Sequence, residues 1–360
     1  MKDEAFEKKF DEYIRKITSR SVPSLFSNVK SLYVDQKKAK AIEGIIMKHI
    51  EALKANDCFA GSDIPQDPTI LLWLLLFAAS HFDQQGDYAK ALELITEAIE
   101  HTPTLVEVYT VKAKIYKHMK DMKKAAETYE MASKMDQADR YLNSRCSKYL
   151  IRAGKIEEAE RMMAHFAKEV NGELNVHEMQ CMWYELEMGQ QYEREEKLAK
   201  SFNMYRYIER HFDTIYDDQF DYHYYALKKG NINSYIEMIK WEDNLYNHKY
   251  FLPGALGLMK CYLKAHKIME KSEKTGEEAK ELEDMKTKDP IEDGVKLAIK
   301  ALKSHANNKE LQSMAAEVFI LKGLSFVNIR KMVTSFKLTN IPKDKQSGFK
   351  EFRRTIFYKM

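Results

Sequence analysis

The chain has 360 residues, of which only 13 are glycine and 7 are proline, while 44% are apolar and 31% are charged. Sheets with many hairpins and Gly-rich nucleotide-binding α/β folds are disfavoured, because their tight corners need residues that tolerate positive φ. The net charge of +3 gives no global attraction to nucleic acid or membrane, so any such partner needs a local basic patch. The composition predicts a mostly helical protein.

The cysteines and the N-terminus indicate a soluble, intracellular protein. The four cysteines are widely separated, which fits buried free thiols better than a disulfide framework or a metal site. Residues 1–10 alternate charge too densely for a secretory signal, and the longest apolar run, residues 70–80, is too short to span a bilayer.

Residues 1–60 predict N-terminal helical pairs. Phe6, Phe10 and Tyr13 recur at helical spacing, and residues 41–53 form an amphipathic pattern. The following residues, 59–68, contain two prolines and a glycine and predict a loop.

Residues 69–212 carry a period of 34 residues, which is typical of tetratricopeptide (TPR) repeats. Small residues recur where two antiparallel helices would cross, and large side chains recur between them. The turn position of the three copies holds Gly86, Lys120 and Gly154. A fourth copy, shifted by an insertion around residues 170–176, is set on Gly189, Ser201 and Tyr205. We predict an all-α, right-handed solenoid of TPR-like antiparallel helix pairs. Its defining positions are Ala79, Phe82, Gly86, Ala91, Ala98, Ala113, Tyr116, Ala125, Ala132, Gly154 and Ala159.

Beyond the repeats, helical periodicity continues at Trp241, Leu245, Leu258 and Tyr262, and Pro290 suits a first helical turn. Residues 267–289 are too poor in apolar side chains to form a core of their own. We therefore expect further helical pairs over 213–266, a charged linker or solvated helix over 267–289, a C-terminal helical unit over 290–338 and a basic tail over 339–360.

The residues that could carry chemistry favour structural interpretations. His177 and Cys181 have the spacing of a zinc-protease helix, but the second ligand is Cys and no third ligand is near, so a surface His and a core Cys are favoured. Asp217, Asp218 and Asp221 could form an acid–base site, although an acidic helix N-terminus explains them better. Phosphate-binding loops and nucleophile-elbow motifs do not occur. We predict that the chain is not an enzyme and binds no metal.

TPR-type solenoids bind partners on a concave surface. One mode is the carboxylate clamp of cochaperones, in which Lys, Asn and Arg hold an acidic C-terminus. The matching positions are Leu76, Ser80, Val111, Tyr141 and Arg145, of which only Arg145 fits. Clamp binding is therefore disfavoured.

A more specific likeness accompanies the repeat. The chain resembles the auxiliary, TPR-repeat subunit of the NatA N-terminal acetyltransferase, in order over about residues 4–266 and faintly to about residue 338. Combinations such as EMQCMW and DDQFDYH are not required by TPR packing, which makes the likeness specific. It corresponds to a middle-to-C-terminal part of that subunit and lacks the long N-terminal superhelix, which indicates a fragment or a divergent short form. The similar segments lie at residues 31–38, 69–118, 138–154, 175–187 and 208–225.

The resemblance implies a non-catalytic scaffold that binds and shapes a catalytic subunit of the GNAT fold and docks the pair on the ribosome. Acetyl-CoA would be bound by that partner and not by this chain. The implied location is cytoplasmic and ribosome-associated, with ribosomal protein and rRNA as contacts and with no DNA or membrane partner. The alternative is a general TPR adaptor or cochaperone unrelated to acetylation.

Two basic patches are candidates for anion binding. Arg15, Lys30, Tyr33 and Lys37 are expected to converge, and the resemblance places an inositol polyphosphate between the catalytic and auxiliary subunits at about this region. A solvated basic face without a ligand is the alternative. The second patch could contact rRNA phosphates or be a disordered or truncated tail, and it comprises Lys343, Lys345, Lys350, Arg353 and Arg354.

Overall fold

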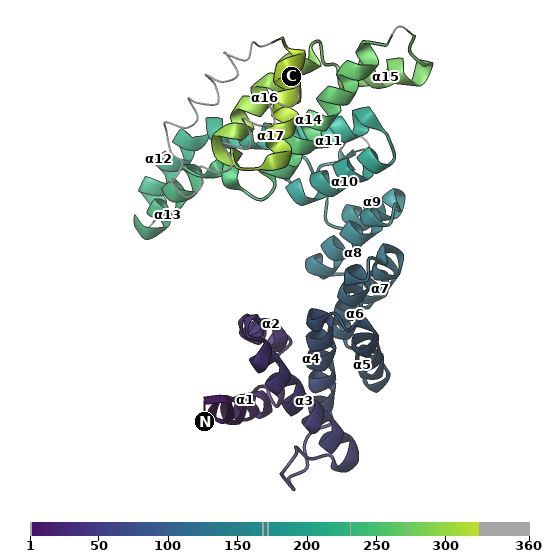
Figure 1. Cartoon of the computed structure of the whole chain (residues 1–360), viewed down its shortest axis with the longest axis vertical. Coiled ribbons are helices and arrows are strands. Elements are labelled where there is room, and N and C mark those ends of the chain that lie inside the picture. The colour runs from purple at the N-terminus through teal and green to yellow at the C-terminus, as the bar shows by residue number, and fades with distance from the viewer. Residues whose placement is uncertain (1, 168, 171–172, 231, 272, 324–360) are drawn as a thin grey trace. The chain divides into compact units, whose positions relative to one another are not determined.

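The computed structural model of the chain describes residues 2–167, 169–170, 173–230, 232–271 and 273–323 (Figure 1). Its contacts divide it into an N-terminal unit, Met1–Phe166, and a C-terminal unit that begins at Ala167. The described residues of each unit are mostly helical, which confirms the predicted all-α fold of TPR-like antiparallel helix pairs. The basic tail, with Lys343, Lys345, Lys350, Arg353 and Arg354, lies outside the described residues, as does the end of the predicted 290–338 unit.

The N-terminal unit begins with three helices and a short 3₁₀ segment and continues as three helical pairs (Figure 1). No helix forms between Asn56 and Thr69, where a loop was predicted. The elements are α1 (Lys2–Thr18), α2 (Leu25–Val29), η1 (Lys30–Val34), α3 (Gln36–Asn56), and the pairs α4 (Thr69–Gln85) with α5 (Tyr88–His101), α6 (Val106–His118) with α7 (Met122–Met135), and α8 (Arg140–Arg152) with α9 (Ile156–Ala164).

The 34-residue period has a backbone cause. Gly86, Lys120 and Gly154 occupy equivalent turns and all have positive φ, at 86°, 64° and 80°. The next residue caps the second helix of the pair: the carboxylates of Asp87 and Asp121 accept hydrogen bonds from the amides of Lys90 and Lys124, each at 3.0 Å. The turn sequence therefore reverses the chain at the same point of each repeat.

The small residues of the repeat lie in the interior of the N-terminal unit. Their side chains are almost completely buried, which lets neighbouring helices approach closely. The larger Phe82 and Tyr116 are half-buried beside them. The buried alanines are Ala79, Ala91, Ala98, Ala113, Ala125, Ala132 and Ala159.

The C-terminal unit opens with a short antiparallel hairpin of β1 (Glu169–Val170) and β2 (Glu173–Leu174), within the predicted insertion. Its α15 turns part of the predicted charged segment into a capped helix, with Thr275 and Glu278 forming a capping box. The helices are α10 (Met182–Arg194), α11 (Leu198–Asp217), α12 (Gln219–Lys229), α13 (Ile232–Glu242), the 3₁₀ segment η2 (Leu245–Asn247), α14 (Phe251–Met269), α15 (Gly276–Met285), α16 (Pro290–His305) and α17 (Lys309–Leu321).

Tyr205, one of the positions that define the fourth predicted repeat, is completely buried in the core of the C-terminal unit. Its ring passes between Gly189 of α10 and Gly257 of α14, where a Cβ on either glycine would overlap the ring. The Tyr205 hydroxyl donates to Glu193 at 3.1 Å, and the Ser201 hydroxyl donates to the carbonyl of Gly189 at 2.9 Å. None of the described helices is both long and apolar enough to cross a lipid bilayer.

Candidate functional site

A groove about 340 Å³ in volume runs along the first helices of the three pairs in the N-terminal unit. We call it the basic groove. It is lined by residues of α4, α6 and α8, with Tyr129 of α7 below and the segment around α2 on one side. This is within the size range of small ligand pockets. Its lining residues are Val22, Pro23, Leu25, Phe26, Ser27, Lys30, Trp73, Leu76, Phe77, Ser80, Asp83, Gln84, Val111, Lys114, Lys117, His118, Tyr129, Arg145 and Tyr149.

The base of the basic groove is aromatic and buried. The rings of Tyr129 and Tyr149 stack with their centroids 4.8 Å apart, and both side chains are buried. Trp73 and Phe77 of α4 are buried as well. Buried, stacked rings of this kind give the groove an apolar base.

The rim of the basic groove carries cations. Lys30, Lys114, Lys117 and Arg145 line it, and none of them forms an ion pair with an acid among the described residues. Arg145 lies over the ring of Tyr141, with 5.1 Å between the guanidinium and the ring centroid. The groove is therefore a region of positive potential on an apolar base.

Sequence reasoning found only part of the basic groove. Four clamp-like positions line it, Leu76, Ser80, Val111 and Arg145, whereas Tyr141 lies outside it and is exposed. The lysines at 114 and 117 were missed because the clamp pattern does not include them. Val111, Lys114 and Lys117 follow one another at intervals of three residues along α6, which keeps them on one helix face. This spacing is the signal that could have identified the two lysines.

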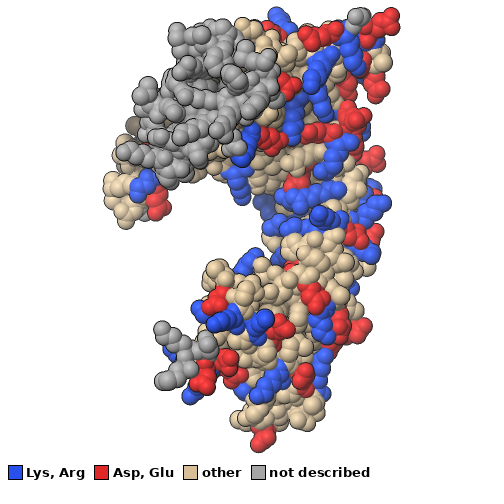
Figure 2. All heavy atoms as spheres, in the orientation of Figure 1, with Lys and Arg blue, Asp and Glu red and all other residues tan. Residues whose placement is uncertain are grey.

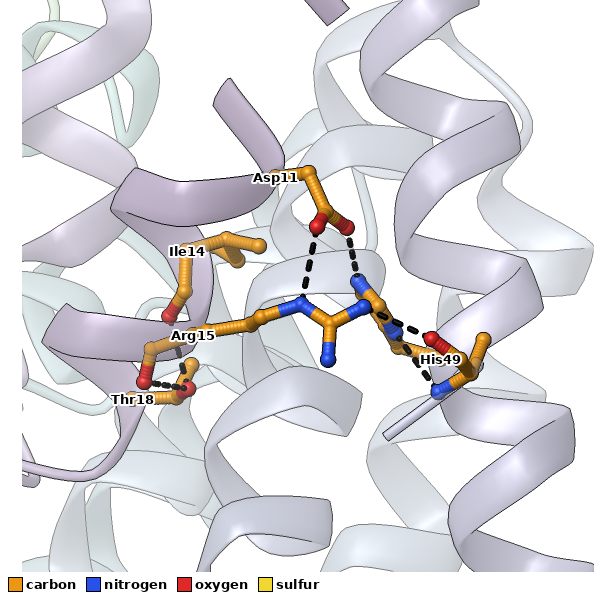
Figure 3. Close-up of polar contacts among 6 residues, drawn as sticks. Asp11, Ile14, Arg15, Thr18 and His49 are labelled. Carbon is orange, nitrogen blue, oxygen red and sulfur yellow. Dashed lines mark hydrogen bonds and ion pairs between the residues drawn. The ribbon is translucent and has the colours of Figure 1, made fainter. Parts of the chain in front are cut away.

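Arg15, the first of the predicted anion ligands, has partners within its own unit (Figure 3). Its Nε donates to Asp11 at 2.8 Å, its Nη2 donates to the carbonyl of Ala60 at 2.7 Å, and its guanidinium lies 5.0 Å from the ring centroid of Phe59. The Arg15 guanidinium therefore connects α1 to the loop after α3 while its side chain stays 28% exposed, and its predicted role in anion binding stays a prediction.

His49 completes this contact. Its Nδ1 accepts from the amide of Ala60 at 3.2 Å, so Nε2 carries the proton and donates to Asp11 at 2.5 Å (Figure 3). Burial lowers the pKa of His49, against the raising effect of Asp11. Burial raises the pKa of Asp11, but hydrogen bonds from Arg15 and His49 outweigh it and the net shift is downward. The pair is an internal polar connection between α1 and α3.

Tyr33 also points inward. Its hydroxyl donates to Nδ1 of His81 at 2.7 Å, and Nε2 of His81 lies 3.2 Å from Glu43. The Tyr33 side chain is buried, and burial raises its pKa. Lys30 and Lys37 are exposed, and Lys30 contributes to the basic groove. An inositol polyphosphate site on these residues stays a prediction, and Tyr33 would reach it only by losing its bond to His81.

The residues singled out for catalysis have structural partners. Glu185 is completely buried, and its Oε1 bonds both His177 and His211 at 2.7 Å, yet this cluster lines neither of the two described cavities. Burial raises the pKa of the Cys181 thiol to about 11. Among the described residues, no group of three or more His, Cys, Asp or Glu side chains is placed to hold a metal ion.

The three aspartates lie where α11 ends and α12 begins. Asp217 is the last residue of α11, Asp218 precedes α12, and Asp221 lies in the first turn of α12. This is the acidic helix N-terminus that the sequence favoured.

The pair α12 and α13 presents a second candidate surface. Trp241, expected at an apolar helical position, is 45% exposed, whereas Leu245, Leu258 and Tyr262 are buried. No residue of α13 is buried among those described. Exposed apolar surface of this extent marks protein–protein contact sites. Its exposed members are Tyr222, Tyr224, Tyr225, Leu227, Ile232, Ile236 and Trp241.

Elsewhere, charge is mixed. On the face drawn in Figure 2, Lys and Arg lie among Asp and Glu over the described surface of each unit. A second cavity, of about 290 Å³, is lined by lysines of α14, but most of these are neutralised: Lys260 pairs with Glu310 at 3.2 Å, and Lys267 with Glu317 at 3.5 Å. The cations of the basic groove differ from these lysines in having no acidic partner among the described residues.

Comparison with known proteins relates the chain to one family. The family model described as N-terminal acetyltransferase A, auxiliary subunit, matches residues 1–285. The chain is 40% identical over 266 residues to the auxiliary subunit NAA15 of the N-terminal acetyltransferase A complex of Arabidopsis thaliana, covering 74% of this chain and 30% of that protein. It is 38% identical over 266 residues to N-alpha-acetyltransferase 16, NatA auxiliary subunit, of Homo sapiens, covering 73% of this chain and 31% of that protein.

The fold is shared with a solved structure of Naa15/Naa10 bound to HypK-THB. The TM-score is 0.78 at 28% identity, over 99% of this chain and 53% of that one. The chain spans less than a third of the length of the curated relatives that it matches.

Proposed function

The chain belongs to the family of NatA auxiliary subunits, and from this premise we propose that it is a non-catalytic scaffold of a cotranslational N-terminal acetyltransferase. The observation that carries the proposal is the match of the family model over residues 1–285. The similar solved structure holds Naa15 together with Naa10, which supports binding to a catalytic partner. Acetyl-CoA and the transfer step would belong to that GNAT-fold partner.

The structure offers surfaces for such a role. The basic groove and the exposed side chains of α12 and α13 are open in the described chain. A large catalytic partner can use both an apolar contact, which supplies most of the binding free energy, and a charged contact, which sets orientation.

The test is copurification. We expect the native protein to bring down a GNAT-fold subunit, and the purified chain alone to transfer no acetyl group to a peptide that begins with Ser or Ala. Replacement of two exposed residues of α12, Tyr224→Ser with Leu227→Ser, should weaken capture of the catalytic subunit. The matched control, Val34→Ser with Ile64→Ser, removes apolar side chains elsewhere that are at least as exposed, and it should not weaken capture.

Two results would overturn this function. Acetyl transfer that survives complete removal of any partner would make the chain an enzyme. Recovery of chaperones without any acetyltransferase would favour a general TPR adaptor or cochaperone.

Ribosome docking and a cytoplasmic location are part of the same proposal. They rest on family membership and on the basic tail of residues 339–360. Contacts to rRNA phosphates are salt-dependent, so we expect cosedimentation with ribosomes that falls as salt rises. Cosedimentation that is unchanged when residues 339–360 are removed would exclude the tail as the contact.

A further inference from the structure

The second cavity, of about 290 Å³, lies within the C-terminal unit and has an apolar floor. We call it the α14 cavity; its lining residues lie between positions 192 and 201 and between positions 260 and 271. Leu198 of α11 and Cys261 of α14 are buried, and Ile268 of α14 is half-buried. Burial of an aliphatic group against such side chains is favourable, because it removes apolar surface from water.

The polar groups of this floor are already paired. The buried Ser201 hydroxyl donates to the carbonyl of Gly189 at 2.9 Å, and the Cys261 thiol donates to the Ser201 hydroxyl with 3.8 Å between the two atoms. Burial raises the pKa of the Cys261 thiol to about 12, so this thiol is neutral at physiological pH. Neither group offers a free donor to a ligand, which favours an aliphatic segment over a polar one.

The rim of the α14 cavity is formed on one side by lysines. They recur at intervals of three or four residues along α14, which places them on one helix face. Three of the four have an acidic partner: Lys260 pairs with Glu310, Lys267 with Glu317 and Lys271 with Glu278. The fourth, Lys264, is exposed and has no acidic partner among the described residues.

Lys264 lies near the apolar floor, since its charge acts on the Cys261 thiol. The acids of the lining do not neutralise it. Glu193 lies 4.0 Å from Lys260 and accepts from the Tyr205 hydroxyl at 3.1 Å. Glu196 is exposed in the turn before α11, where solvent screens its charge.

The charge that remains after ion pairing selects the head group of a ligand. One lysine without an acidic partner matches a single carboxylate. A phosphate or an acidic peptide carries several charges and would have to displace the glutamates that pair with the other lysines. The α14 cavity is therefore suited to a monoanion with an aliphatic tail.

We propose that the α14 cavity binds a fatty carboxylate, with its tail against Leu198, Cys261 and Ile268 and its carboxylate on Lys264. The cavity volume of about 290 Å³ is near the lower end of small-ligand pockets, which fits a tail of medium length. The site goes beyond the proposed scaffold function, because its ligand is a small molecule and its lining belongs to this chain alone.

The test uses the full chain and calorimetric titration with amphiphiles below the concentration at which they form micelles. Decanoate and decylammonium have tails of equal length and opposite charge, and we expect decanoate to bind and decylammonium not to bind. From octanoate to decanoate, affinity should rise by about fourfold for each added methylene, as for burial of a CH₂ group. The gain should stop once the tail fills the cavity.

Two variants test the head and the tail of the ligand. Lys264→Glu should weaken decanoate binding by about fivefold to tenfold, since a charge-assisted contact is replaced by repulsion. Its control, Lys280→Glu, makes the same charge change at an exposed residue outside the cavity and should bind as the unchanged chain does. Ile268→Trp fills the cavity and should abolish binding, whereas Ile236→Trp, on the exposed face of α13, should not.

Far-UV CD shows whether the tryptophan variants fold, and the exposed position of Lys264 keeps the proposal testable if Ile268→Trp does not. Four outcomes would overturn the proposal: no binding of decanoate, equal or tighter binding of decylammonium, equal weakening by Lys264→Glu and Lys280→Glu, and undiminished binding by a folded Ile268→Trp variant. Copurification with an acetyltransferase subunit is measured separately, so failure of this site leaves the scaffold function standing and the reverse also holds.

Discussion

The turn of the repeat predicts stability changes of opposite sign for substitutions at two equivalent positions. Gly86 and Lys120 lie 34 residues apart, and both end the first helix of a pair with positive φ, at 86° and 64°. Glycine reaches this region without strain, whereas a residue with a Cβ pays about 1–2 kcal/mol. Lys120→Gly should therefore stabilise the chain, and Gly86→Ala should destabilise it.

The magnitudes follow from the local structure. A Cβ at Gly86 would meet no heavy atom within 4 Å, so the cost of Gly86→Ala is backbone strain alone, about 1 kcal/mol. Lys120→Gly relieves similar strain. Part of this stabilisation is lost because glycine has greater conformational freedom in the unfolded chain, so the free energy of unfolding rises by about 0.5–1 kcal/mol. Gly44, inside α3 and also with open space around a Cβ, is the control: Gly44→Ala should stabilise by about 0.5–1 kcal/mol.

Thermal unfolding followed by far-UV CD tests all three variants. For a unit of this size, each kcal/mol shifts Tm by about 2–4 °C. We expect a lower Tm for Gly86→Ala and a higher Tm for Lys120→Gly and Gly44→Ala. A higher Tm for Gly86→Ala, or a lower one for Lys120→Gly, would refute the backbone explanation of the repeat.

Further predictions concern the core and its titrating groups. Gly257→Ala should lower Tm by overpacking, at a cost of about 1–3 kcal/mol, because the added Cβ overlaps the buried ring of Tyr205; an unchanged Tm would show that the ring can move aside. Burial lowers the pKa of His81 below 6.5, against the raising effect of Glu43, so the unfolded chain takes up a proton at a higher pH than the folded one. Stability should accordingly fall as pH drops through about 6.5, and His81→Gln should reduce that slope in urea titrations. Burial raises the pKa of the Cys146 and Cys261 thiols to about 12, so an alkylating reagent at neutral pH should modify them only after denaturation, as mass spectrometry would show.

The fold was predictable because repetition amplifies weak local signals. One Gly or Ala is uninformative, but Ala91, Ala125 and Ala159 at one spacing require a common packing role, and all three are buried. The short hairpin at β1 and β2 could not be predicted, because two-residue strands have no periodicity and the insertion interrupts the register. Part of the charged segment forms α15 because of a capping box and the buried side chain of Met285. An argument from composition alone overlooks both features.

The residues predicted to bind an anion show that a run of basic residues in the sequence does not by itself identify a binding site. Arg15, Tyr33 and their neighbours are close in sequence, yet Arg15 bonds Asp11 and Ala60, and Tyr33 bonds His81. A basic run does not reveal which members have internal partners, because those partners come from distant segments. Exposure and pairing, and not local density, decide which cations can bind a ligand.

The basic groove, in contrast, follows from the repeat itself. Positions 77, 111 and 145 are spaced by 34 and hold Phe77, Val111 and Arg145, all of which line the groove. Two neighbouring columns place Ser80 with Lys114 and Asp83 with Lys117, and these four also line it. The register therefore determines which residues share the concave face, while the residue types change from apolar and acidic in the first copy to basic in the later ones. No acid occupies the columns of Lys114 and Arg145, whereas the column of Lys117 contains Asp83, which is held by His118 at 2.7 Å.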